Sequence, residues 1–594
     1  MADQFRFIVD LIFRFMKNFL LLLATLFAFQ GVFATRILVS SPDAINEKTY
    51  NAGDTIVVQN GVYTNKTITF ISNGTAAKPI VLMAQTPGNV ILNGVSRLRM
   101  SGSYLEVSGF RFLDGNSAGS NGVVEFRSSS SALANNCRLT NTSIENYNPT
   151  DNTVDYKWVS IYGTNNKVDN CYFVNKTHSG TMLVVWLVAG AKTSVNHQIL
   201  NNYFAYRNPN FDDDGKEING QEIIRIGDSN TSLQPSNCLV EENYFERCNG
   251  EMEIISNKSC GNVYRNNMFY ECAGALTLRH GNGCTVDGNW FIGNNIANTG
   301  GIRIIGEDHL VINNYFQQTR GTNYRAPICV IRGEVNNELN GYAQVKNAKI
   351  LFNTIYNCRS GFSVSYGSDG QTLSAINSVI AHNVCYQTSS SDYTVQVVQA
   401  SPAISWENNI FNGGRSTNTP SSGIITNVNP ALTSFSTDGY SIYRPTTNSP
   451  LTTYRTSSVY AGVSTDIWGF SRPTAKLPGA METDAGQNRI IPSAATTGVL
   501  WMKTPTDEKK KPVNNSLQIF PNPASTEISI SLDENFDYSQ LLIFDTAGKL
   551  HCENIVETRH ATSLQINISH LPQGLYVVQL LNNKQPQQAV FLKK

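Results

Sequence analysis

The stretch that decides the fold is residues 238–292, CLVEENYFERCNGEMEIISNKSCGNVYRNNMFYECAGALTLRHGNGCTVDGNWFI. Within it, an asparagine followed by a pair of aromatic or aliphatic residues recurs after 24 and 22 residues (Asn243, Asn267, Asn289). The same phrase recurs on both sides of this stretch, at Asn170 (with a cysteine inserted), Asn202, Asn314, Asn353, Asn383 and Asn409. Self-similarity at a period of tens of residues is the mark of a repeat architecture.

Each repeat contains short runs of Val, Ile, Tyr and Phe separated by Asn and Gly, and helical periodicity is scarce. A unit of about 22 to 25 residues accommodates three short strands and three turns, which is one coil of a parallel β-helix. We therefore expect an all-β protein whose main domain, residues 35–485, is a right-handed parallel β-helix. The asparagines would form a hydrogen-bonded ladder, the aromatics would stack inside, and longer intervals would hold inserted loops. A propeller is the competing architecture, but its blades are longer and more uniform.

The composition narrows the class of ligand. Lysine plus arginine and aspartate plus glutamate both number 45, and 15% of the residues are charged. A nucleic-acid-binding protein would normally show a basic excess, so we expect no nucleic-acid partner. If the ligand is a polyanion, its positive site must be local.

The N-terminus has the features of an export signal. An apolar run, residues 19–29, follows Lys17 and ends near Val32-Phe33-Ala34, a plausible cleavage site before Thr35. We expect residues 1–34 to be a signal peptide, with Met16 as an alternative natural start. The run is short for a membrane span and no other run is long enough, so we expect a mature protein without one.

The composition changes near the other end. Residues 486–515 are predicted to be a linker, because residues 503–515 are charged and polar. From residue 516 a new pattern begins with Phe520-Pro521-Asn522-Pro523, continues with alternating strands and ends on two lysines. It resembles the C-terminal sorting domain of type IX secretion cargo in Bacteroidetes. The resemblance implies a small β-sandwich over residues 516–594, a type IX secretion partner, and a secreted, cell-surface or periplasmic location in a Gram-negative bacterium. A sugar-binding sandwich is the alternative.

Eleven cysteines in an exported chain would ordinarily suggest disulfides. Here Cys238, Cys260 and Cys284 are 22 and 24 residues apart, and Cys248 and Cys272 are 24 apart. Because these intervals match the repeat, we interpret the cysteines mainly as stacked, buried small residues.

Two carboxylates are the first candidate site residues. On a strand, Glu251 and Glu253 lie on one face because the side-chain period is two. Adjacent outward carboxylates repel each other, and a divalent cation relieves the repulsion. Oxygen-only ligands suit Ca²⁺. A solvated strand face is the ordinary explanation for such a pair taken alone.

Basic residues follow at the interval of the repeat. Arg279 lies 21 residues after Lys258, and Arg303 lies 24 residues after Arg279. If one repeat is one inter-strand step of about 4.8 Å, the three form a cationic column beside the carboxylates. Such a column matches a polyuronate, whereas coincidental surface charges are the bland alternative.

Three phrases then occur in order: NGQEIIRIG at 219–227, EMEIISNKS at 251–259 and RHGN at 279–282. With the repeats, they make residues 36 to about 480 resemble polysaccharide lyase family six, the family of alginate lyases and the dermatan-cleaving chondroitinase B. The resemblance implies that Lys258 is the Brønsted base and Arg279 the acid. It also implies that Glu251, Glu253 and Asn219 bind calcium; Gln221, on the same face as Asn219, is the alternative third ligand.

The implied reaction removes the C5 proton of a uronate and expels the C4 oxygen. Lys258 must be neutral to accept the proton, and positive neighbours favour its neutral form. An arginine rarely gives up a proton. We therefore expect Arg279 to stabilise the leaving oxygen or the carboxylate, with a proton relayed from water or His280. As the next residue along the strand, His280 should point to the opposite side unless a bulge intervenes, so packing and function remain open for it.

Four further residues are candidates for binding neighbouring sugars: Arg225, Arg303, Glu334 and Arg332. A structural role within its rung is the alternative for Arg225. Together these residues predict a secreted polysaccharide lyase that cleaves alginate by β-elimination. The alternatives are the same chemistry on dermatan sulfate, a β-helix hydrolase, and a non-catalytic glycan-binding solenoid. A hydrolase would need clustered aspartates at the site, but Asp212-Asp213-Asp214 falls in an apparent loop.

Overall fold

The computed structural model describes residues 34–503, except 47, 117–121, 213, 402, 458–459, 461 and 484–486. It also describes residues 518–594, except 521–522, 532–537, 546–548, 556–562 and 583–586. The predicted signal peptide, apart from Ala34, lies outside the described residues, as do residues 504–515 of the predicted linker and residues 516–517 of the predicted sandwich. The chain divides into two compact units, residues 1–504 and 505–594.

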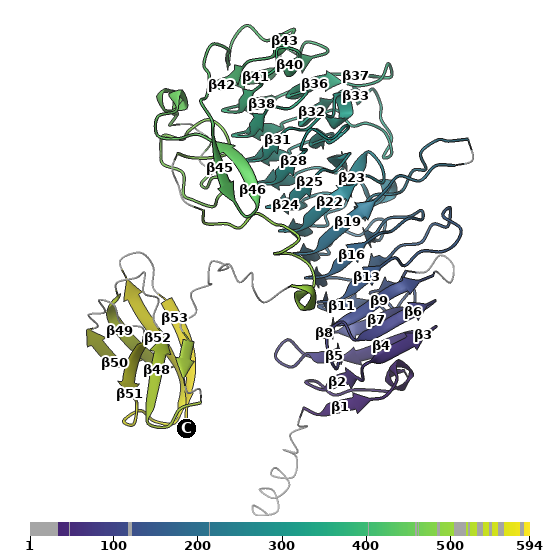
Figure 1. The fold of residues 1–594 in the computed structure, drawn as a ribbon, viewed down its shortest axis with the longest axis vertical. Coiled ribbons are helices and arrows are strands. Elements are labelled where there is room, and N and C mark those ends of the chain that lie inside the picture. Colours follow the sequence, from purple (N-terminus) through teal and green to yellow (C-terminus); the bar gives the residue numbers. More distant parts are fainter. Residues whose placement is uncertain are drawn as a thin grey trace, which may run out of the picture. The chain divides into compact units, whose positions relative to one another are not determined.

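The first unit is a parallel β-helix of three 14-stranded sheets, and the strands of each sheet succeed one another along the unit (Figure 1). Sheet 1 consists of β1 (Arg36–Val39), β2 (Thr55–Val58), β5 (Ile80–Ala84), β8 (Leu105–Ser108), β12 (Arg138–Thr140), β15 (Lys167–Asp169), β18 (Gln198–Leu200), β21 (Leu239–Glu241), β24 (Val263–Arg265), β27 (Thr285–Asp287), β30 (Leu310–Ile312), β34 (Lys349–Leu351), β38 (Ser378–Ala381) and β41 (Ile404–Glu407).

Sheet 2 consists of β4 (Thr67–Asn73), β7 (Arg97–Ser103), β11 (Ala134–Asn135), β10 (Val124–Glu125), β14 (Val159–Ile161), β17 (Leu183–Val185), β20 (Ile224–Gly227), β23 (Glu253–Lys258), β26 (Ala275–His280), β29 (Ile302–Ile304), β32 (Ile328–Ile331), β36 (Phe362–Tyr366), β40 (Tyr393–Val397) and β43 (Arg415–Thr417). Sheet 3 consists of β3 (Gly61–Thr64), β6 (Val90–Gly94), β9 (Phe110–Gly115), β13 (Ser143–Glu145), β16 (Tyr172–Val174), β19 (Tyr203–Arg207), β22 (Tyr244–Cys248), β25 (Met268–Tyr270), β28 (Trp290–Ile292), β31 (Tyr315–Gln317), β35 (Thr354–Tyr356), β39 (Val384–Tyr386), β42 (Asn409–Asn412) and β44 (Ile424–Ile425).

The described part of the chain contains only short 3-10 helices besides strands: η1 (Pro42–Ile45), η2 (Ser229–Thr231), η3 (Asn323–Arg325), η4 (Pro450–Tyr454) and η5 (Leu500–Met502). None of them is long and apolar enough to cross a membrane. The all-β prediction and the parallel β-helix are therefore confirmed.

The asparagine ladder lies at the turn before sheet 3. Each side-chain amide donates to the side-chain oxygen of the next asparagine at 2.9–3.0 Å, from Asn202 to Asn409. The same oxygens also accept the preceding rung's main-chain N–H, as in the 3.1 Å bond from Asn267 to Asn289. The ladder thus satisfies buried main-chain donors that no strand pairs. At the rung of Asn170, the inserted Cys171 holds the ladder position and donates its N–H to Asn202.

The residue before each ladder asparagine has a positive φ, for example 58° at Asn201 and 56° at Asn266. Asparagine tolerates this left-handed backbone better than most residues. The Asn-Asn doublets of the sequence therefore serve two purposes, one residue for the turn and one for the ladder. Behind the ladder, phenylalanine rings stack inside the helix at centroid distances of 4.6–5.1 Å, from Phe173 through Phe316.

The segment after the last rung folds back along the unit. The hairpin of β45 (Thr433–Thr437) and β46 (Tyr440–Arg444) and the residues after it cover the aromatic outer face of sheet 3, where Trp468 packs on Trp290 at 4.8 Å. Trp501 donates to the carbonyl of Asn141. Residues 487–503 therefore pack on the β-helix, so its unit extends past the boundary predicted at residue 485.

All eleven cysteines lie among the described residues as free thiols, and nine of them are buried. Cys248 and Cys272 show the expected stacking, since the Cys248 N–H points to the Cys272 sulfur at 3.4 Å. Their interpretation as stacked small residues is confirmed.

The second unit is a sandwich of two antiparallel sheets. One sheet contains β47 (Gln518–Phe520), β48 (Glu527–Ser531) and β51 (Ser563–Asn567). The other contains β50 (Leu550–Ile555), β49 (Tyr538–Asp545), β52 (Gly574–Asn582) and β53 (Gln587–Lys593). Residues of both sheets share one core, in which Ile530 and Val578 are fully buried. The predicted β-sandwich is confirmed.

Candidate active site

Most candidate residues gather on the outer face of sheet 2, where β20, β23, β26 and β29 lie side by side. Arg225 of β20 lies opposite Ser256 of β23, which lies opposite Thr277 of β26, and Thr277 lies opposite Arg303 of β29. Lys258 lies opposite Gly227 on one side and His280 on the other.

The predicted single column of Lys258, Arg279 and Arg303 is wrong in register. The pairing of β23 with β26 shifts between Asn257 and Lys258, so Arg279 is left in a bulge and His280 takes the position opposite Lys258. Arg303 belongs to the neighbouring line, two residues away. Repeat length alone could not reveal this shift, because one unpaired residue changes the register without changing the interval much.

The bulge brings His280 to the side of the basic residues. Its Nδ1 lies 3.4 Å from Nη1 of Arg279, and its Nε2 lies 3.5 Å from Oγ of Ser229. Burial, with the positive charges of Arg279 and Lys258, lowers the pKa of His280 to about 3. His280 is therefore neutral at ordinary pH.

Lys258 ends β23 and is partly exposed. Its ammonium group makes no hydrogen bond or ion pair with any residue that the structure describes. A surface lysine without a carboxylate partner is common, but here the side chain lies beside two other basic groups. Nothing described in the fold neutralises or orients it.

Arg279 is held by a loop that sequence reasoning missed. Its guanidinium donates to the carbonyls of Gly341 at 2.7 Å and Asn340 at 3.0 Å, and lies 4.1 Å from the ring centre of Tyr342. Burial lowers the pKa of Arg279 from its ordinary value. Because the loop lies more than sixty residues away in sequence, no local spacing pointed to it.

The same loop accounts for Glu334. Its carboxylate accepts the N–H of Tyr342 at 3.1 Å, and its own N–H donates to the Tyr342 carbonyl. Farther along, the carbonyl of Leu339 accepts from Ser232 at 3.0 Å. Glu334 thus braces the loop that holds Arg279. Arg332 donates to Gln399 and to the carbonyl of Gly367, which places it in a second loop contact.

Glu251 lies two residues before the start of β23. Its carboxylate accepts the main-chain N–H groups of Gly220 at 2.8 Å and Gln221 at 3.0 Å. Burial, followed by the negative charges of Glu222 and Glu253, raises the pKa of Glu251 to about 8. Glu222 is a further carboxylate that the sequence reading did not single out, although it adjoins Gln221; it accepts from Thr181 at 2.9 Å.

Glu253 forms the ion pair of the site. Its Oε1 lies 2.8 Å from Nη2 of Arg303, with side-chain exposures of 13% and 4%. Its Oε2 accepts from Ser256. Arg303 also lies over the ring of Tyr324 at 5.4 Å. The pair therefore joins the carboxylate and basic parts of the site.

The residues fit a calcium ion through the chemistry of their donors. Burial and then the negative charges of Glu222 and Glu253 raise the pKa of Glu251, and a cation bound by the carboxylate oxygens would offset these effects. Asn219 is exposed beside Gly220, whereas the side chain of Gln221 is buried and bonded within its own loop to Ile218 and Asn210. Asn219 therefore stays the candidate for the third ligand, because its side chain is exposed and that of Gln221 is buried. The described residues contain no group of three or more His, Cys, Asp or Glu side chains suited to a metal.

The other candidates are placed as follows. Arg225 lies 5.3 Å from the ring centre of Trp186, and its Nε is buried without a partner among the described residues. Asp212 accepts the N–H groups of Asp214 and Lys216, which is a turn within an exposed loop, while Asp213 lies outside the described residues. The aspartate cluster needed for a hydrolase is therefore not found at the described part of this site.

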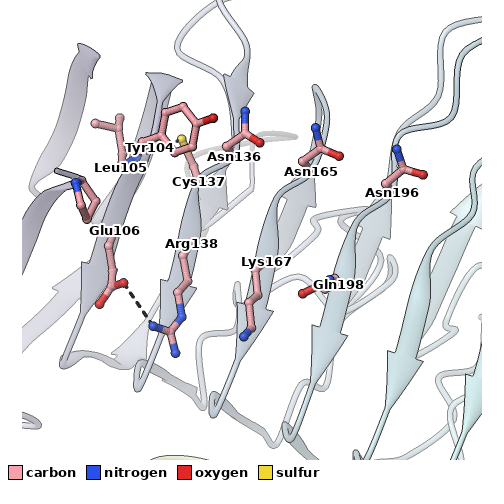
Figure 2. A pocket seen from close by; sticks show the side chains of 11 residues that line it. Tyr104, Leu105, Glu106, Asn136, Cys137, Arg138, Asn165, Lys167, Asn196 and Gln198 are labelled. Atoms are coloured by element: carbon pink, nitrogen blue, oxygen red, sulfur yellow. Dashed lines mark hydrogen bonds and ion pairs between the residues drawn. The ribbon is translucent and has the colours of Figure 1, made fainter. Parts of the chain in front are cut away.

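A shallow cavity of about 380 Å³ lies elsewhere, on sheet 1. Figure 2 shows three asparagines in a row, Asn136, Asn165 and Asn196, with Arg138 and Lys167 below them. Arg138 is paired with Glu106 and Asp169, and the asparagines have positive φ values of 52–55°. The turn geometry and ion pairs explain these residues, and none of the candidate residues lines the cavity.

A parallel β-helix with basic and acidic groups on one long sheet face is suited to binding an extended, charged polymer. Residues 39–463 match the family model for chondroitinase B, and residues 518–594 match the model for the secretion system C-terminal sorting domain. A search of curated proteins found no match.

Solved structures agree with the family. The alginate lyase AlyGC of family PL6 is 31% identical over 78% of this chain and 58% of its own, with a TM-score of 0.66. A mannuronic acid-specific family 6 lyase from the human gut microbiota is 32% identical over 66% of this chain and 91% of its own (TM-score 0.59). The lyase Pedsa3628 from Pseudopedobacter saltans is 25% identical over 78% and 99% (TM-score 0.58).

The chain therefore belongs to the chondroitinase B family, polysaccharide lyase family 6, and carries a secretion sorting domain. It spans less than two thirds of the length of AlyGC. The family resemblance predicted from the sequence is confirmed.

Proposed function

We propose that this protein cleaves alginate by β-elimination and leaves an unsaturated uronate at the new chain end. Two of the similar structures are described as alginate lyases or as specific for mannuronic acid. The basic groups of sheet 2 supply local positive charge for a polyanion in a chain whose net charge is zero.

The observation that carries the proposal is the unpartnered amine of Lys258. A general base needs an accessible lone pair within reach of the substrate proton that it removes. A carboxylate partner would hold the amine protonated. Lys258 has no such partner among the described residues, and its neighbours are cationic Arg279 and neutral His280. Lys258 takes the C5 proton as the bond to the C4 oxygen breaks.

Arg279 stabilises the negative charge that develops on the departing oxygen. The two carbonyl bonds and the Tyr342 ring fix its guanidinium, so little reorganisation is needed during the reaction. His280, neutral and 3.4 Å from Arg279, is placed to relay a proton from water. A calcium ion held by Glu251, Glu253 and Asn219 would supply charge neutralisation for the uronate carboxylate.

The test is the ultraviolet absorbance of the double bond formed by elimination, followed separately with alginate and with dermatan sulfate. A rise with alginate supports the proposal. New reducing ends without absorbance would identify a hydrolase, and binding without cleavage would identify a glycan-binding protein.

Dermatan sulfate is the second candidate substrate, because the matching family model is that of chondroitinase B. The chemistry would be the same, since dermatan also contains a uronate. A flat trace on alginate with a rise on dermatan sulfate would select it.

The sorting-domain match supports export through the type IX secretion machinery. We propose that the protein acts outside the cell or on its surface, where polymeric substrate is accessible. Deletion of residues 518–594 should retain the enzyme in the periplasm, as measured by fractionation.

A further inference from the structure

Two aromatic side chains with a basic side chain at each end form a row along sheet 2, on rungs that precede Lys258 in the chain. Arg127 lies 4.0 Å from the ring centre of Tyr162, Tyr162 stacks on Trp186 at 6.1 Å and 9°, and Trp186 lies 5.3 Å from Arg225. All four side chains are partly exposed. We call these residues the arginine–aromatic strip.

The strip lies in line with the proposed base. Ile161 is opposite Val185, and Val185 is opposite Ile226, so Tyr162 and Trp186 follow on the line that leads to Gly227 and Lys258. At Gly227 this line carries no side chain. A Cβ there would lie 2.6 Å from the carbonyl of Lys258, and φ is 79°, so glycine is required. Gly227 therefore adds no side chain between Trp186 and Lys258, and the space that a Cβ would take is filled by the Lys258 carbonyl, Thr231 and Leu187.

The charges of the strip suit an anion. Arg225 has no hydrogen-bond partner among the described residues, and its buried Nε is unsatisfied. A buried polar group without a partner is costly unless a ligand completes it. At the other end, the buried Glu125 pairs with both Arg99 and Arg127, so two guanidinium groups share one carboxylate. A net positive charge remains at each end.

A purely structural ladder would look different. The phenylalanine stack that holds the helix together is buried inside it, for example at Phe245 and Phe269. The strip instead lies outside, on the same sheet face as Lys258. Tyr393 and Arg415 form a comparable pair at 4.0 Å near the opposite end of sheet 2, which provides a matched comparison.

We propose that the arginine–aromatic strip binds further uronate units of the substrate, so that the bound chain extends from Lys258 toward β10. This inference rests on the proposed function. From β23 to β10 there are four inter-strand steps, which is about 19 Å at 4.8 Å a step. The guanidinium groups of Arg225 and Arg127 bind uronate carboxylates, and the stacked rings of Trp186 and Tyr162 keep those groups in place.

The experiment compares Arg127→Ala and Trp186→Ala with Arg415→Ala as the matched control. For each variant, kcat/KM is measured on polymeric alginate and on an alginate trisaccharide, which is too short to reach β10. The value for the polymer divided by the value for the trisaccharide should fall about tenfold in Arg127→Ala, which equals about 1.4 kcal/mol. The fall should come mainly from a higher KM for the polymer. Arg415→Ala should leave the ratio unchanged.

Equal ratios in all variants would overturn the proposal, as would a fall only in Arg415→Ala. An equal fall in all three would indicate general attraction of a polyanion and would also overturn it. A second measurement needs no turnover: the affinity for an alginate oligosaccharide longer than the trisaccharide is compared between Lys258→Ala and the double variant Lys258→Ala/Arg127→Ala. If the wild type cleaves neither substrate, the proposed function fails instead, and the binding measurement still tests the strip.

Discussion

Replacing Arg303 by methionine should destabilise the β-helix in a way that calcium reverses. Arg303 and Glu253 form a 2.8 Å ion pair with side chains 4% and 13% exposed. Removing one partner of a buried pair costs about 3–5 kcal/mol because the other charge stays buried. Ser256 still donates to Glu253, so we expect about 3 kcal/mol, the lower end of that range.

The assay is urea unfolding of the full chain in chelator, for wild type, Arg303→Met, Glu253→Gln and the double variant. The double variant leaves neither charge unpaired, so it should recover about 2 kcal/mol relative to the sum of the single variants. Calcium added to Arg303→Met should restore stability, since the ion would neutralise Glu253 and Glu251. At a hundred times its dissociation constant, a bound ion contributes about 2.7 kcal/mol.

Two results would refute this reasoning. If Arg303→Met and the double variant unfold at the same urea concentration, the ion pair does not couple the residues. If calcium stabilises the double variant as much as Arg303→Met, Glu253 is not a ligand.

Asn289→Ala should lower the free energy of unfolding by about 2–4 kcal/mol, because it leaves the buried N–H of Asn267 unsatisfied. The control Asn165→Gly, at an exposed turn with φ 55°, should change it little. Both are measured from the midpoints of urea unfolding. Tyr342→Ala should lower kcat about tenfold with a smaller change in KM, since it frees the guanidinium of Arg279; an effect on KM alone would contradict this. The pKa of His280 is about 3 when folded against 6.5 ordinarily, so the unfolded chain binds the extra proton between these values. The stability contributed by neutral His280 is therefore complete above pH 6.5 and lost as pH falls toward 3, and His280→Gln should flatten the pH dependence of the urea midpoint in that interval.

Much of the fold could be predicted because the residues that form each rung recur at regular intervals in the sequence. The ladder asparagines and the phenylalanines recur once per rung, and each rung repeats the same local solution to buried main-chain donors. The rung of Asn170 shows the limit of this sequence phrase, because the turn residue and the ladder residue are both asparagine in four of the eight rungs from Asn202 to Asn409. At that rung only the turn position is asparagine.

The site was less predictable because it depends on register and on distant loops. Lys258, Arg279 and His280 were identified from their phrases, but the bulge that places His280 beside them leaves no sequence signal. Glu334 was expected to contact substrate, and its hydrogen bond to Tyr342 in the loop that holds Arg279 could not be foreseen from the sequence. Contacts across more than fifty residues, such as those that hold Arg279, come from loop folding that periodicity does not describe.

The most direct test of the account is the ultraviolet absorbance produced from alginate by the wild type and by Lys258→Ala, at matched concentrations and with matched unfolding curves. If Lys258 is the base, the absorbance should rise steadily with the wild type, and Lys258→Ala should lose nearly all of this rise while it still binds the oligosaccharide. A rise of similar rate in Lys258→Ala would contradict the assignment of Lys258 as the base that removes the C5 proton.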